Sequence, residues 1–379
     1  MRHTGSCRGC VRSVVSAAFG NNKQPGEHGL MQRQRGVTNS PAIRLVSAAA
    51  AAAAGPATTT APGWDRARAT QFQIPSRSNS GGGSSSPFPA NTKRTPVEPG
   101  VVSPARLVPD HIPKTPYYAT GAVPPQDNNV HLHTAETLAP MRKACTLARD
   151  MLDLCCEMAQ PGVTTDAIDA AVHAAIVEAG ACPSPLNYHG FPKSVCSSVN
   201  EIACHAIPDD RPLRDGDLVS FDVSVFYKGF HGDNCATVGV GTVDDAGKLL
   251  MHATQEAMME GVSVCRPGAC LTEIGSAIHA VADRYGFDTV RKYCGHGVGS
   301  SFHMLPFVEH FRNNRRLEMV PGMTFTIEPI FTEGSEATTV WPDAWTVQTV
   351  DGGRAAQFEH VVLITEEGHE VLTVPSQRA

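Results

Sequence analysis

Two aspartates in one strongly patterned segment are the first candidates for chemistry. Asp222 and Asp233 lie eleven positions apart, and a hairpin that turns at Tyr227 and Lys228 would make them direct cross-strand partners. Directly opposed side chains have Cβ atoms about 4.5–5.5 Å apart. Two carboxylates held that close repel each other unless they share a proton, face a basic side chain or bind cations. The segment therefore predicts either a salt-bridged hairpin or a metal site.

Three further side chains could complete such a metal site, and each lies beside a strand signal. His296 stands between two glycines, Glu328 ends the run Gly-Met-Thr-Phe-Thr-Ile, and Glu359 precedes the run His-Val-Val-Leu-Ile. With the two aspartates they give four carboxylates and one imidazole, an oxygen-rich set of ligands. Four negative charges balance two divalent cations, which favours a dinuclear site over a single structural zinc.

An internal repeat relates two of these carboxylates. Residues 160–168 match residues 266–274, and the offset of 106 positions continues so that Asp222 coincides with Glu328. Asp233 and Glu359 lie 126 positions apart, so the second half must carry an insertion of about 20 residues. Two similar halves, each with helices followed by strands, would bring the equivalent acids together at a central cleft. The recurring residues include the glycine pairs Gly162 and Gly268, Gly180 and Gly286, and Gly216 and Gly322.

Helix signals precede the strand signals in each half. Apolar residues recur at steps of three and four over 138–155, which predicts a helix that begins near Thr137. Thr165 is expected to cap a second helix. The repeat predicts matching helices at roughly 249–264 and 271–285. This order of elements favours an α+β domain in which the helices pack against one antiparallel sheet, and His173 and His279 fall at packing or surface positions of the helices.

The distribution of charge divides the chain into two parts. Residues 1–95 hold 12 of the 31 lysines and arginines but only two of the 37 acidic residues, a net charge of +10. This part is rich in Ser, Ala and Gly and has too few apolar residues to bury a core, so we expect it to be disordered. An Arg- and Ser-rich, acid-poor N-terminus is typical of an organellar transit peptide, and a nucleic-acid-binding tail is the alternative. The sequence has no run of 18 consecutive apolar residues, so it predicts no membrane span.

The remaining chain predicts an arm and one folded domain. Residues 96–131 are punctuated by prolines and predict an extended arm that lies along the surface of a domain at 132–375. Ten of the 12 cysteines are scattered among apolar neighbours of the later segment, which favours a reducing compartment over disulfides. Cys7 and Cys10 form one Cys-x2-Cys pair without a second pair nearby to complete a zinc site.

Residues from about 132 to 375 closely resemble a type I methionine aminopeptidase of peptidase family M24, subfamily A, in its organellar form. The motifs that carry the resemblance occur in the order typical of the family: Tyr-His-Gly-Phe-Pro-Lys-Ser-Val-Cys at 188–196, Cys-His-Ala-Ile-Pro-Asp at 204–209, Gly-Phe-His-Gly-Asp at 229–233, Cys-Gly-His-Gly-Val-Gly at 294–299, Gly-Met-Thr-Phe-Thr-Ile-Glu-Pro at 322–329 and Gln-Phe-Glu-His at 357–360. The resemblance implies the α+β "pita-bread" fold, in which two pseudo-symmetric halves pack helices on a curved antiparallel sheet.

The resemblance also implies a role for each site residue. Two divalent ions of cobalt, manganese, iron or zinc would be held by Asp222, Asp233, His296, Glu328 and Glu359. His205 and His303 would hydrogen-bond the scissile amide and its developing oxyanion, and Glu328 would shuttle a proton to the leaving amine. With these two histidines, the pocket for a methionine side chain would be lined by Tyr188, Phe191, Cys196, Phe302 and Trp345.

These roles imply a metalloaminopeptidase that removes the initiator methionine from nascent proteins whose second residue is small. A hydroxide that bridges the two cations would attack the first peptide bond. The partners would be the N-termini of nascent polypeptides, at the ribosome, and we expect a monomer whose catalytic domain binds neither nucleic acid nor a membrane. The basic leader, and the lack of a zinc-finger region in residues 1–131, favour a mitochondrion or plastid over the cytoplasm.

Two departures and two alternatives accompany this interpretation. Ala206 replaces a glycine that is common in the family, and Pro185 stands where many bacterial members have a cysteine of the side-chain pocket. A proline-specific aminopeptidase or prolidase would keep the same five ligands, but it usually carries a folded N-terminal domain. A binding protein that kept the fold and lost catalysis would lose ligands or flanking histidines, and none is lost here.

Overall fold

The computed structural model describes residues 95–126 and 129–376, and the structural statements below concern these residues. The predicted basic leader, except for Thr95, and the pair Cys7 and Cys10 lie outside them. Among the described residues no helix combines the length and the apolarity that a membrane crossing requires. All ten described cysteines are free thiols, in agreement with the prediction that disulfides do not stabilise the domain.

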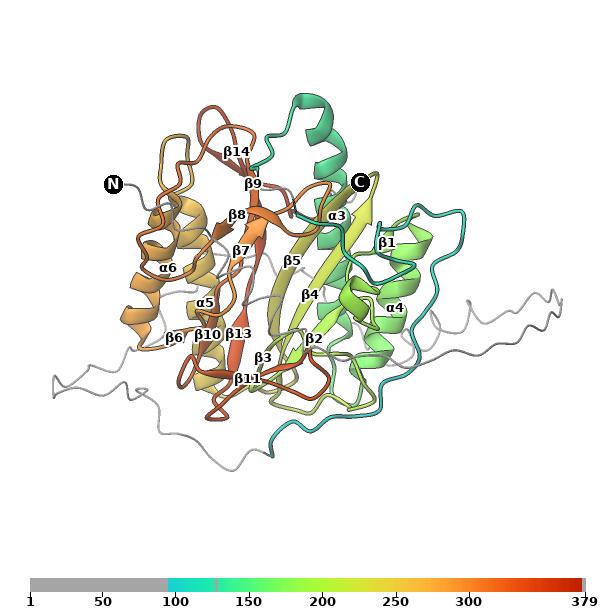
Figure 1. Ribbon diagram of the computed structural model, residues 1–379. Helices are drawn as coiled ribbons and strands as arrows, with labels where there is room; N and C mark the ends of the chain where they lie inside the picture. Colours follow the sequence, from blue (N-terminus) through green and yellow to red (C-terminus); the bar gives the residue numbers. More distant parts are fainter. Residues whose placement is uncertain (1–94, 127–128, 377–379) are drawn as a thin grey trace, which may run out of the picture. The chain divides into compact units, whose positions relative to one another are not determined.

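Four helices of 14 to 24 residues form where periodicity and repeat predict them. Figure 1 shows one pair beside the strands of the first half and the other pair beside those of the second half. The third helix begins before the predicted residue 249 because Asp244 caps it, accepting a hydrogen bond of 2.7 Å from the backbone N–H of Gly247. The helices are α3 (Ala135–Met158), α4 (Thr165–Glu178), α5 (Asp245–Ser263) and α6 (Leu271–Tyr285).

The cap of α4 differs by one residue from the prediction. Thr164 is the N-cap, and its side chain accepts a hydrogen bond from the backbone N–H of Ala167. Thr165 is instead buried, with its hydroxyl donating to the backbone carbonyl of Asp209 at 3.1 Å. The predicted cap at Thr165 is therefore wrong, because tertiary contacts decide which of two adjacent threonines points at the helix.

The sheet of the first half is built around one long hairpin. The hairpin strands pair over ten residues each, and two shorter strands pair with the outer edge of the first of them, all antiparallel. The strands are β1 (Cys182–Pro183), β2 (Cys196–Val199), β4 (Leu218–Tyr227) and β5 (Phe230–Gly239).

The hairpin turns one residue later than predicted, so Asp222 and Asp233 are not direct partners. Lys228 and Gly229 form the two-residue turn, with φ of 53° and 85°, as the tight hairpin turn with two left-handed residues requires. Asp222 therefore pairs with Cys235, and Asp233 pairs with Ser224. Because this register moves each aspartate by an even number of positions, both still project from the same face of the hairpin, as diagonal neighbours.

The second half repeats this plan with an excursion. Its main sheet is again antiparallel and consists of β7 (Gly295–Gly297), β8 (Met304–Val308), β9 (Thr324–Ile327), β14 (His360–Ile364) and β15 (His369–Val371). The chain between β9 and β14 takes the place of the tight turn of the first half, at the predicted insertion. It adds β10 (Ile330–Thr332), β11 (Thr338–Val340), β12 (Val347–Thr349) and β13 (Ala355–Gln357), which pair with β6 (Asp288–Thr289) and β3 (Ile202–Cys204).

The strands thus form four hydrogen-bonded sheets where one was predicted, although every pairing is antiparallel as expected. A bridge between Cys235 of β5 and Glu359 joins the two main sheets, with the N–H of Glu359 donating to the carbonyl of Cys235 at 2.8 Å. One buried apolar cluster also runs through both halves, and its members include Leu152, Phe221 and Ile278. The α+β class with two similar halves is confirmed.

The repeated glycines adopt matching backbone conformations. Gly162 and Gly268 have φ of 88° and 81°, and Gly216 and Gly322 have φ of 88° and 90°. Side chains rarely tolerate this left-handed region, so glycine is required at the same turns of each half. The repeat is therefore a structural one, and it places Asp222 of β4 and Glu328 at equivalent points.

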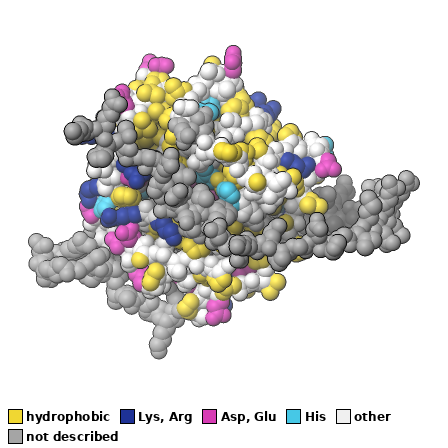
Figure 2. Space-filling view, viewed as in Figure 1, with side chains coloured by type: hydrophobic (Ala, Val, Ile, Leu, Met, Phe, Trp, Pro, Cys, Tyr) yellow, Lys and Arg dark blue, Asp and Glu magenta, His cyan; other side chains and the backbone are white. Residues whose placement is uncertain are grey.

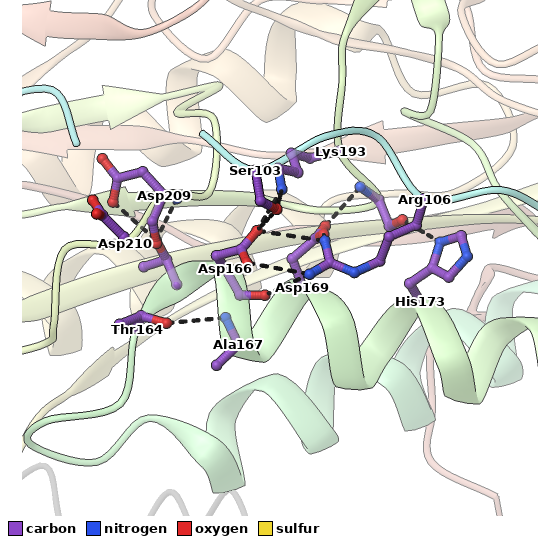
Figure 3. A network of polar contacts seen from close by, with 12 residues as sticks. Ser103, Arg106, Thr164, Asp166, Ala167, Asp169, His173, Lys193, Asp209 and Asp210 are labelled. Atoms are coloured by element: carbon purple, nitrogen blue, oxygen red, sulfur yellow. Dashed lines mark hydrogen bonds and ion pairs between the residues drawn. The ribbon is translucent and has the colours of Figure 1, made fainter. Parts of the chain in front are cut away.

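Residues 95–126 contain no helix or strand and are held on the domain by polar contacts, many of them on α4. Arg106 donates to Asp169 at 2.7 Å and to Asp166 at 3.2 Å, and the buried Lys193 also bonds Asp166. Figure 3 shows Arg106 between the two aspartates, with His173 beside it. His173 is buried and hydrogen-bonded to Ser194 at 2.8 Å, so it is a packing residue, as predicted. We call residues 95–126 the arm.

Charged side chains of both signs lie among apolar ones on the face that Figure 2 shows. Surface ion pairs such as Arg142 with Glu370 and Arg312 with Asp283 join opposite charges at 2.6–2.7 Å.

Candidate active site

One pocket gathers all twelve residues that the sequence marked for chemistry. They reach it from both halves: from β2 and the loop before it, from the residue after β3, from the hairpin β4–β5, from β7 and the loop after it, from the residues flanking β9 and β14, and from the excursion. The residues that line it are Asp222, Asp233, His296, Glu328, Glu359, His205, His303, Tyr188, Phe191, Cys196, Phe302 and Trp345.

Three of the predicted ligands lie within reach of one ion. Single ligand atoms of Asp233, His296 and Glu359 all lie within 4.8 Å of one another, and the three residues are buried. The Nε2 atom of His296 lies 3.6 Å from Oδ2 of Asp233 and 3.5 Å from Oε1 of Glu328. Asp222 lines the same pocket without belonging to this group of three.

Hydrogen bonds fix how these ligands point. The Oγ hydroxyl of Ser224 donates to Asp233 at 2.7 Å, and the Oγ1 hydroxyl of Thr326 donates to Oε1 of Glu328 at 2.8 Å. Nδ1 of His296 lies 3.1 Å from the carbonyl oxygen of Gly297. A proton on Nδ1 donated to that carbonyl leaves Nε2 with a free lone pair directed at the carboxylates, the arrangement that a metal-binding histidine needs.

Burial sets the electrostatics of the carboxylates. It raises the pKa of Asp222 to about 7. Burial, followed by the charges of neighbouring acids, raises the pKa of Asp233 and of Glu359 well above the usual range, and burial does the same for Glu328. Within the described residues no lysine or arginine forms an ion pair with any of the four. Such acids can be held together by a shared proton, a basic side chain or cations. Cations fit this donor set best, and a set of carboxylates and one imidazole suits Mn, Fe, Co or Zn.

Two further histidines flank this cluster in uncharged form. His303 stacks at a tilt on His296 with ring centroids 4.2 Å apart, and its Nδ1 has no hydrogen-bond partner among the described residues. Burial lowers the pKa of His205 to about 4 and that of His303 well below its usual value. His205 also holds a left-handed φ of 58°, a strained conformation that proteins keep mainly at functional positions.

Aromatic rings form the apolar wall of the pocket. Tyr188 meets Phe302 edge to face with centroids 5.1 Å apart, and Phe191 meets Trp345 in the same way at 5.0 Å. Cys196 lies on β2 directly opposite Asp222, so a predicted metal ligand and part of the wall are built on neighbouring strands. The pocket therefore combines a charged end with an apolar end.

Sequence reasoning missed several residues of the pocket. Cys294 begins the motif around His296 and Tyr293 directly precedes it, so their position beside His296 was an available signal. Gln126 of the arm gave no signal, yet its side chain donates to the carbonyl of His303 at 3.0 Å. The other residues of the lining that were not predicted are His189, Ser224, Phe307, Val340 and Ala344.

Of the two residues that depart from the family pattern, only one lies at the pocket. Pro185 lines the pocket. Ala206 does not, and its backbone N–H donates to the hydroxyl of Ser198 at 3.3 Å. His279, on α6, accepts from the backbone of Arg312 at 3.4 Å and stands apart from the pocket, as predicted.

Comparisons with known proteins agree with one another. The sequence profile described as metallopeptidase family M24 matches residues 139–366. The chain is 48% identical to "Methionine aminopeptidase 1B, chloroplastic" of Arabidopsis thaliana over 74% of this chain and 76% of that protein. It is 46% identical to "Methionine aminopeptidase 1D, mitochondrial" of Homo sapiens over 73% of this chain and 83% of that protein. Among solved structures, the methionine aminopeptidase from Rickettsia prowazekii has a TM-score of 0.64 at 41% identity, over 65% of this chain and 100% of that chain.

Proposed function

The chain belongs to metallopeptidase family M24 and, within it, to the type 1 methionine aminopeptidases, and from this premise we propose that it removes the initiator methionine of nascent proteins whose second residue is small. Its fold is the pita-bread fold of that family. The observation that carries the proposal is the pocket itself, which joins a buried carboxylate and imidazole cluster to an aromatic wall of the size and apolarity that a methionine side chain needs.

The five predicted ligands are our proposal for a site of two divalent ions. Their four carboxylates balance the charge of two such ions, and Asp233, His296 and Glu359, whose ligand atoms lie together, would hold an ion there. Bound there, the cations would polarise the scissile carbonyl and lower the pKa of an attacking water molecule.

The protein's own side chains would bind the reacting amide and transfer the proton. His205 and His303 are uncharged at neutral pH, so each can donate one hydrogen bond, to the scissile amide and to the oxyanion that develops from it. Glu328 would carry a proton to the leaving amine. Its Oε1 already accepts from Thr326, whereas its Oε2 has only a long 3.4 Å contact from Gln357, so Oε2 is the atom free to move the proton.

The aromatic wall would select the side chain. Methionine is unbranched, and its thioether makes favourable contacts with the edges of aromatic rings. The edge-to-face pairs of Tyr188 with Phe302 and of Phe191 with Trp345 line this part of the pocket. Gln126 and His303 close one side of the opening, which would limit the size of the residue after the cleaved bond.

The test is release of free amino acid from Met-Ala-Ser and from Ala-Pro-Ser by the full chain, chelated and then supplied with Mn or Co. We expect methionine to be released only when metal is restored, and the proline peptide to remain intact. Cleavage of the proline peptide alone would move the protein to the proline-specific branch, and no cleavage with any metal would favour a binding relative without catalysis.

For its place in the cell we propose an organelle, because the relatives above are named chloroplastic and mitochondrial and the first 95 residues are basic and poor in acids. Residues 1–95 fused to a fluorescent protein should enter mitochondria or plastids, and a diffuse cytoplasmic signal would contradict this. We further propose a monomer that meets nascent N-termini at the ribosome without binding nucleic acid itself.

A further inference from the structure

The loop that carries part of the aromatic wall is held in a strained shape. Residues 184–191 bring Pro185, Tyr188 and Phe191 to the pocket. Within this loop Asn187 and His189 have left-handed φ values of 61° and 47°. Non-glycine residues in this region cost free energy and persist only where surrounding contacts impose them. Hydrogen bonds within the loop, such as that from the N–H of Asn187 to the carbonyl of Phe191 at 2.7 Å, hold part of this shape, and contacts from outside the loop add to them.

The arm supplies those contacts. The Tyr117 hydroxyl donates to the backbone carbonyl of Ser184 at 2.7 Å, and its ring meets the ring of Tyr188 edge to face, with centroids 5.0 Å apart. Next to it, the side chain of Asn187 donates to the carbonyl of Tyr118 at 2.8 Å. Tyr117 is only 2% exposed, so it is fully engaged with the loop although it lies 67 positions before Ser184.

Ser184 connects this contact to the opposite side of the wall. Its Oγ lies 2.9 Å from Nδ1 of His231, and both residues are buried. The His231 ring stacks on Phe302, with centroids 5.2 Å apart and planes 7° from parallel. Tyr117 thus lies behind Tyr188, His231 lies behind Phe302, and Ser184 joins the two. None of the three lines the pocket.

We propose that Tyr117, Ser184 and His231 form a backing cluster that positions the aromatic wall of the methionine pocket, with Tyr117 as a positioning residue contributed by the arm. The inference rests on the proposed function, which it deepens by assigning side-chain selectivity to residues that do not touch the substrate. Burial raises the pKa of the Tyr117 phenol well above its usual value, so the hydroxyl remains a donor throughout the physiological range.

Tyr117→Phe removes the hydrogen bond from the hydroxyl to Ser184 and keeps the ring against Tyr188. The buried carbonyl of Ser184 then loses its donor, and the loop loses the contact that fixes Tyr188 relative to Phe302. Losing one such bond corresponds to a change of about three- to tenfold in an equilibrium. We therefore expect KM for Met-Ala-Ser to rise about three- to tenfold, with kcat within about twofold, and the preference for Met-Ala-Ser over Leu-Ala-Ser to fall by a similar factor because the wall is no longer fixed.

Tyr118→Phe is the matched control. It removes the same hydroxyl from the adjacent residue, but that hydroxyl accepts from the backbone of Val108 within the arm and makes no contact with the loop. The backbone carbonyl of Tyr118 that binds Asn187 remains in place. We expect its KM, kcat and selectivity to match those of the unmodified protein.

The experiment measures KM, kcat and the Met-to-Leu ratio for the unmodified full chain and both variants, together with bound metal and the thermal unfolding midpoint. A rise in KM and a loss of selectivity confined to Tyr117→Phe, at equal metal content, support the backing cluster. Unchanged kinetics in Tyr117→Phe, or a fall in kcat at constant KM, overturn it even if the variant unfolds earlier. If the unmodified protein itself releases no methionine, the proposed function fails first, and the inference falls with it.

Discussion

The carboxyl groups of Asp222, Asp233, Glu328 and Glu359 lie in a pocket whose described residues offer them no lysine or arginine partner. An isolated buried carboxylate is costly, which is why burial raises the pKa of each of them. Such a group keeps its charge only with a compensating cation. The chemistry proposed for the pocket therefore follows from burial as much as from the identity of the ligands.

Asp222→Asn tests this at one residue. The amide keeps the shape of the carboxyl group but supplies neither its charge nor its strength as a ligand. Since changes merely next to a metal ligand cost 10–100-fold in affinity or activity, loss of a ligand should lower methionine release by more than about 100-fold with the fold retained. Metal content, methionine release and circular dichroism would be measured together.

Asp245→Asn provides the control for that variant. Asp245 lies in the first turn of α5, with a side chain that is 95% exposed. It should leave turnover unchanged. Full activity in Asp222→Asn would contradict the proposed site of two divalent ions.

The elements differ in how they are held. The helices are fixed by an apolar face. The arm, which has no helix or strand, is fixed by polar contacts at Asp166 and Asp169 of α4 (Figure 3) and by a small apolar cluster that Val108 and Ile112 form with Cys182 and Leu186. The Asp169 side chain is only 1% exposed, and it also accepts from the backbone N–H of Ser194 at 2.7 Å. Burial opposes ionisation of Asp166, but the bonds from Lys193, Ser103 and Arg106 hold its pKa well below the usual range.

Arg106→Ala should therefore destabilise the arm and the domain beneath it. It removes a hydrogen-bond donor from the buried carboxylate of Asp169, which costs about 1–3 kcal/mol. Equilibrium urea unfolding measures the loss. Limited proteolysis should also cut the arm of the variant sooner than that of the unmodified protein.

Arg142→Ala is the comparison for this prediction. It breaks an ion pair with Glu370 whose two side chains are 45% and 38% exposed, and exposed pairs contribute less than about 1 kcal/mol. If Arg106→Ala and Arg142→Ala lowered the free energy of unfolding by the same amount, the contact of Arg106 with Asp169 would contribute no more than an exposed ion pair.

The excursion between β9 and β14 shows what an insertion can add to a repeated plan. The first half closes its hairpin with Lys228 and Gly229, whereas the second half inserts four short strands there. The turn between β11 and β12 brings Trp345 to the pocket, with Asp343 accepting from the backbone N–H of Trp345 at 2.8 Å. The two halves thus supply equivalent acidic residues to the pocket, whereas the excursion adds Trp345 to its aromatic wall from the second half alone.

Across the whole molecule, the predicted ligands come from both halves. Asp222 and Asp233 belong to the first, and His296, Glu328 and Glu359 to the second. Cations held among them would link the halves as the shared apolar cluster does, so metal should stabilise the entire domain. A ligand at a hundredfold excess over its Kd adds about 2.7 kcal/mol to the free energy of unfolding.

This stabilisation should depend on pH in a defined direction. The folded, metal-free protein binds protons on acids with raised pKa values, so that form loses stability as pH rises through those values, about 7 for Asp222. Cations compete with the same protons. The gain in the unfolding midpoint on adding Mn to chelated protein should be largest above about pH 7 and shrink toward pH 5.

Thermal unfolding with and without Mn at several pH values measures that difference. His296 contributes no competing step above pH 5, because burial lowers its pKa to about 4. A gain from Mn that is independent of pH would contradict the assignment of buried acids as the ligands.

The sequence by itself determined the helices, the repeat and twelve of the residues that line the pocket, because these depend on local signals. Periodicity marks a buried helix face, a glycine marks a left-handed turn, and a motif keeps its residues in order. Even so, local signals left the predicted hairpin turn and the predicted cap of α4 one residue away from where they are, and the pairing partner of Asp222 two positions away. Gly229 is a local signal for the observed turn, whereas the backbone carbonyl of Asp209 that engages Thr165 is in place only when the chain is folded.

Only the tertiary structure decided what stands behind the pocket. Tyr117, Ser184 and His231 lie far apart in the sequence, and no period or spacing relates them, yet hydrogen bonds of 2.7 and 2.9 Å join them. The same holds for Gln126 at the opening. Contacts between distant residues depend on how completed elements pack, and the packing of an arm without a helix or strand leaves no periodic trace in the amino-acid sequence.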